Sequence, residues 1–130
     1  GPHHWVFHAA LRAIDRWVSA RTPPPAAPRI ATEPGPPPTL ARDAHGNAIG
    51  GIRTPHLDVP VATLSGVGNT PAGLCALFGT TSPFTEEKLR ALYPNGSRAA
   101  RFAQATAAAV QAGFILPVDR DAVNASAAGR

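Results

Sequence analysis

The sequence has 130 residues, which suggests one domain or part of one, and it carries a formal net charge of +4 at pH 7. Its basic residues are scattered rather than clustered on one face, and no apolar run approaches the roughly 20 residues that cross a bilayer, so neither a nucleic-acid partner nor membrane insertion is expected. One cysteine excludes an internal disulfide, and no signal peptide is predicted, so the cellular location is undetermined.

The first segment, residues 1–21, is predicted to contain one helix over about residues 4–20. Phe7, Leu11, Ile14 and Val18 recur at the spacing of one helical face. Because charged and polar residues occupy the other side, we expect a surface helix that packs through this apolar stripe.

Residues 22–39 are predicted to form an extended linker, because eight of these residues are proline. Pro25 and Pro28, followed by Arg29, also match the pattern of a ligand for an aromatic-lined groove. Such matches are common in proline-rich spacers, so the spacer interpretation is favoured.

Residues 40–81 form an irregular segment rich in glycine and proline, which we call the strap. Residues 59–64 are a candidate strand, but Pro60 limits it to an edge position, and no partner strand is evident. The apolar residues around Cys75 predict a short buried turn or helix, with Cys75 as a small buried side chain rather than a reactive thiol.

Arg53 and Asp58 are candidate binding residues of the strap, because a guanidinium group can clamp a substrate carboxylate. The favoured interpretation is structural. A strap needs donors for its backbone carbonyl groups, and Arg53 could tie several of them together.

Residues 82–130 are predicted to be mainly helical. Thr85 is a suitable N-cap, Ser97 is predicted to cap a second helix over about residues 98–112, and Gly113 fits the position after its end. In that second helix we expect Phe102 and Thr106 to lie on the inner face, together with Ala99, Ala109 and Val110.

The sequence contains no catalytic signature, so no catalytic residue is assigned. The G-x-S-x-G pattern of a serine nucleophile is absent: Ser65 has Thr63 where the first glycine should be, and Ser97 is better explained as a helix cap. No phosphate-binding loop or dinucleotide fingerprint is present, and no cofactor is predicted.

The histidines do not have the spacing of a metal site, and none is predicted. His4 and His8 could share a helix face, but no acidic residue there completes a ligand set. A weaker alternative is a metal-dependent enzyme that uses His45, His56 and Asp58.

Several blocks in order, "GPHHWVFHAALRAIDRWV", "GNAIGGIRTPHLDVPVAT", "LFGTTSPF" and "AAGFILPVD", resemble the C-terminal region of the alpha/beta hydrolase domain-containing proteins, which are large, mostly bacterial serine hydrolases. The resemblance covers about residues 1–124. It implies that residues 1–21 are the last helix of a hydrolase core and that the remainder wraps back over that core.

The resemblance further implies that the nucleophile and the acid, and with them the catalytic His, lie upstream. His3 and His4 are weak binding candidates, because they would lie nearest to the loop that carries that His. The expected fold is a fragment of an α/β-hydrolase fold, mainly α with three to four helices, long Pro/Gly-rich segments and at most one or two short strands.

The expected function is therefore that of a hydrolase C-terminal part, active on esters or amides when whole and inactive alone. Its expected partner is the N-terminal hydrolase core or an equivalent protein. The alternative is a non-catalytic, proline-rich and helical interaction module.

Overall fold

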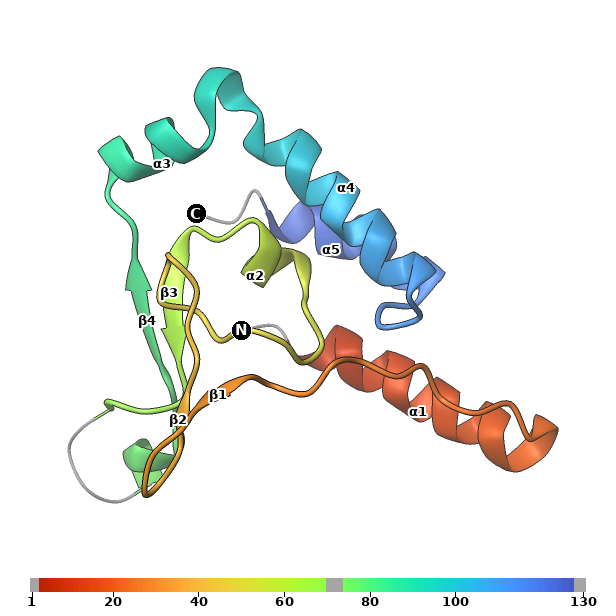
Figure 1. Ribbon diagram of the computed structural model, residues 1–130. Coiled ribbons are helices and arrows are strands. Elements are labelled where there is room, and N and C mark those ends of the chain that lie inside the picture. The colour runs from red at the N-terminus through yellow and green to blue at the C-terminus, as the bar shows by residue number, and fades with distance from the viewer. Residues whose placement is uncertain (1–2, 70–73, 128–130) are drawn as a thin grey trace.

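A computed structural model describes residues 3–69 and 74–127. In these ranges the chain forms α1 (His4–Ala20), β1 (Thr32–Glu33), β2 (Thr39–Leu40), α2 (Pro55–Asp58), β3 (Ala62–Ser65), β4 (Thr80–Pro83), α3 (Glu86–Leu92), α4 (Arg98–Gln111) and α5 (Arg120–Ser126). Short 3₁₀ turns lie at Leu74–Leu77, Pro94–Gly96 and Pro117–Asp119. Figure 1 shows the β3–β4 pair on one side, α4 and α5 on the other, and α2 between them.

The mainly helical composition was predicted, but the predicted numbers of three to four helices and at most one or two short strands were too low, because the described residues form five α-helices. The described residues hold four short strands in two separate antiparallel pairs, β1 with β2 and β3 with β4. The candidate strand at 59–64 begins only at Ala62, after Pro60, and aligns Ala62 with Pro83. Its partner β4 has the sequence TTSP, which lacks the apolar alternation by which strands are recognised.

The proline-rich residues that follow α1 turn back along it. The Thr22 N–H donates to the carbonyl of Arg16. The ring of Pro25 lies 3.3 Å from the position that a Cβ atom at Gly113 would occupy. The Pro28 carbonyl accepts a hydrogen bond from Gly51. Because these prolines contact the chain itself, the geometry favours the spacer interpretation over that of a free groove ligand.

Helix α1 has the predicted bounds, but the packing predicted for it was wrong. The stripe of Phe7, Leu11, Ile14 and Val18 is between 51% and 76% exposed. The helix instead contacts the remaining chain through Trp5 and the small buried Ala9. None of the helices in the described residues has the length and apolar content to cross a membrane.

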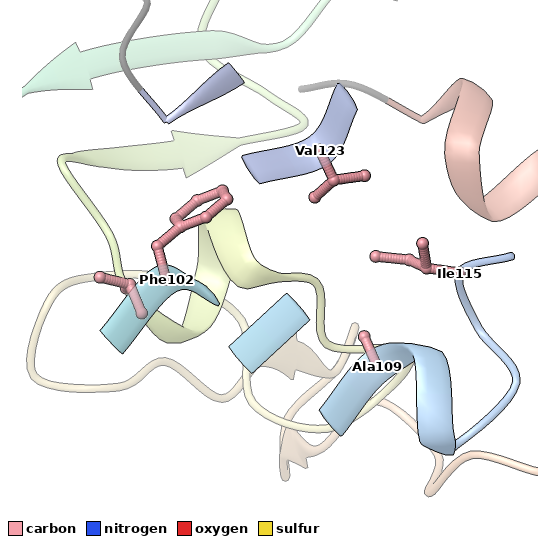
Figure 2. Packing of buried hydrophobic residues seen from close by; sticks show 5 residues of the cluster. Phe102, Ala109, Ile115 and Val123 are labelled. Carbon is pink, nitrogen blue, oxygen red and sulfur yellow. The ribbon is translucent and has the colours of Figure 1, made fainter. Parts of the chain in front are cut away.

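The hydrophobic core lies between α4, α5 and the end of α2, as Figure 2 shows. It consists of Val59, Phe102, Ala109, Ile115 and Val123. Five residues make a small core for a chain of 130, as the scarcity of large apolar side chains predicted. Phe102 and Ala109 confirm the inner face expected for α4, whereas Ala99 is exposed.

The helix boundaries in the C-terminal part follow local signals. Thr85 caps α3, its hydroxyl accepting a hydrogen bond from the Lys88 N–H at 3.2 Å, as predicted. Gly113 ends α4 with a φ of 79°, also as predicted. Ser97 stands at the N-cap of α4, but its hydroxyl makes no capping bond because its backbone is already helical, so the predicted cap was wrong.

The turn at Leu74–Leu77 is present, but the burial predicted for it was wrong. Leu74 and Leu77 are mostly exposed, and Cys75 is exposed as well.

We predict that Ile115→Val weakens the protection of the α4 amides against hydrogen exchange. Ile115 is 2% exposed, so deleting one methylene group leaves a void that costs about 0.5–1.5 kcal/mol in opening free energy. Ile30 is 53% exposed, and Ile30→Val is the matched control, for which no change is expected. Equal effects of the two substitutions would contradict the location of the core.

Candidate functional site

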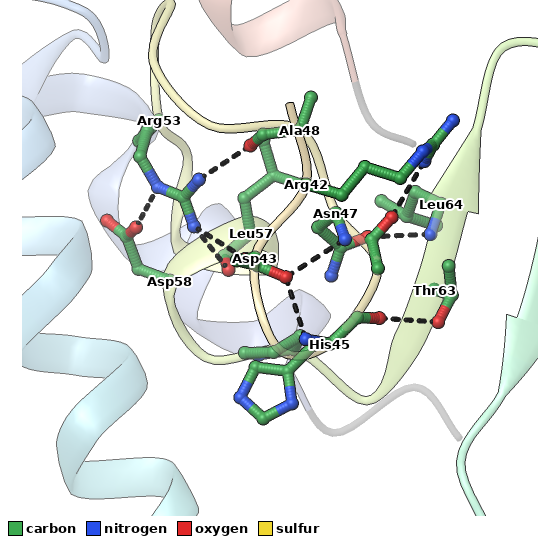
Figure 3. Close-up of polar contacts among 12 residues, drawn as sticks. Arg42, Asp43, His45, Asn47, Ala48, Arg53, Leu57, Asp58, Thr63 and Leu64 are labelled. Atoms are coloured by element: carbon green, nitrogen blue, oxygen red, sulfur yellow. Dashed lines mark hydrogen bonds and ion pairs between the residues drawn. The ribbon is translucent and has the colours of Figure 1, made fainter. Parts of the chain in front are cut away.

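The strap is held in place by Arg53, shown in Figure 3. Its Nε donates to Asp58 Oδ1 at 2.6 Å, its Nη1 to the carbonyl of Ala48 at 2.8 Å, and its Nη2 to the carbonyl of Leu57 at 3.0 Å. Asp43 Oδ2 lies 3.6 Å from Nη2. The two binding candidates Arg53 and Asp58 are therefore brought together, and the guanidinium has little capacity left to clamp a substrate carboxylate.

The buried amide of Asn47 joins the first part of the strap to β3, which lies later in the strap. Its Oδ1 accepts a hydrogen bond from the Leu64 N–H at 2.7 Å, and its Nδ2 donates to the Ala62 carbonyl at 3.2 Å. Asn47 is 0% exposed, and it satisfies the backbone of β3 on the side away from β4, as a neighbouring strand would. This arrangement closes one edge of the β3–β4 pair.

A cleft of about 770 Å³ lies between the start of α1 and the β3–β4 pair. Its walls are largely apolar, with Phe7 from α1 and Phe78 from the turn before β4. Its polar lining includes His3, His56 and Ser65. A cleft of this size and composition suits a ligand or a covering segment of protein.

Of the two weak histidine candidates, only His3 lines the cleft. His3 precedes α1 and is exposed. His4 is also exposed, and its ring lies 4.1 Å from that of Trp5. The structure therefore brings His3, but not His4 or Arg53, into the cleft lining.

The serines of the chain are not arranged as nucleophiles. Ser65 Oγ accepts a hydrogen bond from the Val67 N–H at 3.3 Å, and no histidine in ranges 3–69 and 74–127 hydrogen-bonds this hydroxyl. Ser126 Oγ lies 3.1 Å from His56 Nε2, but its proton is donated to the carbonyl of Val123. In this arrangement His56 is the donor of the pair, so the two side chains are not aligned as a nucleophile and its base.

The family of this chain is identified from a match along most of its sequence, not from the residues of one site. The family described as alpha/beta hydrolase domain matches residues 1–125. The chain belongs to the alpha/beta hydrolase domain family. No curated protein and no solved structure matches it. The resemblance seen in the motifs is thereby confirmed, and the chain is assigned a hydrolase-like fold.

The described part of this family member brings no three His, Cys, Asp or Glu side chains together as metal ligands. The alternative of His45, His56 and Asp58 as ligands has no geometric support. The ring of His45 lies beside Phe84, His56 bonds to Ser126, and Asp58 pairs with Arg53.

Sequence reasoning did not single out Asn47, because its contacts with β3 span 15 and 17 residues. It considered His56 only as a ligand of the metal alternative. The partner of His56 lies 70 residues away, and no local pattern signals such a pair.

We predict that Asn47→Asp exposes the amide of Leu64 to faster hydrogen exchange. The substitution keeps the side-chain shape but removes the donor to the Ala62 carbonyl and buries a carboxylate beside it, which costs about 1–3 kcal/mol. Asn95→Asp is the matched control, because Asn95 is exposed and its positive φ is tolerated by Asp. Unchanged exchange at Leu64 in Asn47→Asp would contradict this role.

Proposed function

We propose that this chain is the C-terminal part of an alpha/beta-hydrolase-like ester or amide hydrolase, and that it contributes structure rather than the nucleophile. The exposed apolar stripe of α1 carries this proposal. Phe7, Leu11, Ile14 and Val18 lie on one face, and none of them is buried. An amphipathic helix with its apolar face in water is costly, at roughly 25 cal/mol per Å² of exposed apolar surface.

The chemistry of the chain supports the same proposal. No G-x-S-x-G elbow occurs in the sequence, no histidine of the described residues hydrogen-bonds the Ser65 hydroxyl, and the Ser126 hydroxyl donates to the carbonyl of Val123 rather than to His56. The described strands form two antiparallel pairs rather than the parallel sheet on which a nucleophile elbow stands. A core that supplies both the sheet and the nucleophile would also cover α1.

The partner in this proposal is the hydrolase core or an equivalent protein. The cleft between α1 and the β3–β4 pair adjoins the apolar stripe, because Phe7 belongs to both. A single apolar element of the core could therefore cover the stripe and also enter the cleft.

A non-catalytic interaction module is the second candidate, which the same exposed side chains favour. The hydrolase part and the interaction module predict different unfolding of the isolated chain. A fragment that needs its core should melt broadly by circular dichroism, whereas a cooperative melt would favour the independent module.

We predict that the purified chain does not hydrolyse short-chain nitrophenyl esters above the uncatalysed rate. Ser65→Ala should leave this result unchanged, as should Ser19→Ala, the control on the exposed side of α1. The measurement is the release of nitrophenol at saturating ester. Robust turnover that Ser65→Ala or Ser126→Ala abolishes, and that Ser19→Ala retains, would overturn the proposal.

A further inference from the structure

His56 joins four helices through a single side chain. It belongs to α2, and its ring stacks on Trp5 of α1 with centroids 6.0 Å apart and planes at 12°. The edge contact with Phe102 of α4 has centroids 5.0 Å apart at 88°. Its Nε2 donates to Ser126 of α5 at 3.1 Å.

Helix α1 depends strongly on this junction. Its apolar stripe is exposed, so it is held mainly at its first turns, where Trp5 packs against the core. A second contact joins His8 Nδ1 to Asp119 Oδ2 at 3.1 Å, and it is exposed on the His8 side. The first turns also form one wall of the cleft through Val6 and Phe7, and His56 lines the same cleft.

His56 is half-buried at this junction, where burial and the positive charge of Arg98 disfavour the protonated ring. Burial, and then positive charge nearby that includes Arg98 of α4, lowers the pKa of His56 below its ordinary value of 6.5. Ser126 on α5 is neutral, His3, which precedes α1, lines the same cleft, and Asp58 on α2 is paired with Arg53. Within the described ranges, no carboxylate is hydrogen-bonded to the His56 ring to stabilise its cation.

We propose that His56 is a pH-sensitive latch, whose protonation releases the first turns of α1 from α2, α4 and α5 and opens the cleft. The latched state contains neutral His56. The stabilisation from the neutral ring is fully present above pH 6.5 and is lost as the pH falls toward the lowered pKa of the folded state. The His8–Asp119 contact does not involve His56, so release is confined to the Trp5 end of α1.

The fluorescence of Trp5 tests this latch in the 130-residue chain. The chain has two tryptophans, so Trp17→Phe leaves Trp5 as the only reporter. On titration from neutral to mildly acidic pH, we expect one red shift of the emission with a midpoint below 6.5, while the far-ultraviolet circular dichroism is retained. Absence of a shift would overturn the proposal.

Two further variants identify the titrating group. In the Trp17→Phe background, His56→Gln retains a donor for Ser126 but cannot titrate, so the emission should no longer depend on pH. His8→Gln is the control and should retain the transition. A transition that persists in His56→Gln, or that disappears in His8→Gln alone, would overturn the proposal.

A measurement on the unmutated histidine covers the case in which His56→Gln does not fold. The ring protons of His56 and the indole signal of Trp5 are followed by NMR in the Trp17→Phe chain. Coincident midpoints support the latch. Separate midpoints, or a His56 midpoint at or above 6.5, would overturn it.

Discussion

The buried amide of Asn47 is the contact on which the strap and the β3–β4 pair both depend. The sheet has only two strands, so each strand has one edge without a partner strand. Asn47 satisfies that edge of β3 with a side chain from the strap, and this places Arg53 where it can bond to three further points of the same segment. Irregular backbone is thus held by side-chain donors rather than by regular secondary structure.

Gly50 shows how closely the strap packs against residues before it. At Gly50 the φ is 81°, and a Cβ atom there would lie 2.2 Å from the Arg29 carbonyl oxygen. Only glycine allows that approach. The strap therefore lies tightly against the chain on one side, whereas the apolar stripe of α1 is left exposed.

The contrast between a tightly bonded strap and an exposed helix face is central to the proposed function. Arg53 and Asn47 bond several backbone groups of the strap, whereas the apolar stripe of α1 is not covered by the described residues. The proposal that the chain is part of a larger hydrolase rests on this contrast, on the small core and two short sheets of the described residues, and on the lack of a nucleophile elbow in the sequence. His56 contacts both Phe102 of the core and Trp5 of α1, the helix whose apolar stripe is exposed.

Sequence reasoning succeeded where structure is local. The bounds of α1, the cap at Thr85 and the helix end at Gly113 depend on residues a few positions apart, and all were predicted. It failed where a contact spans the chain. The pairing of β3 with the polar β4 was invisible, and the burial expected at Cys75 depended on neighbours that the sequence cannot place.

The candidate site shows the same division. Arg53 and Asp58 were both named as candidates from the strap sequence, and they prove to be bonded partners. The contacts of Asn47 and His56 were not predicted, because their partners lie far along the chain.

The intact mass of the native protein from its source organism, measured together with the upstream coding sequence, tests the central claim most directly. The account predicts a product much larger than 13.4 kDa whose upstream sequence contains an in-frame G-x-S-x-G. A native mass near 13.4 kDa would contradict the account and would make the chain an independent binding module.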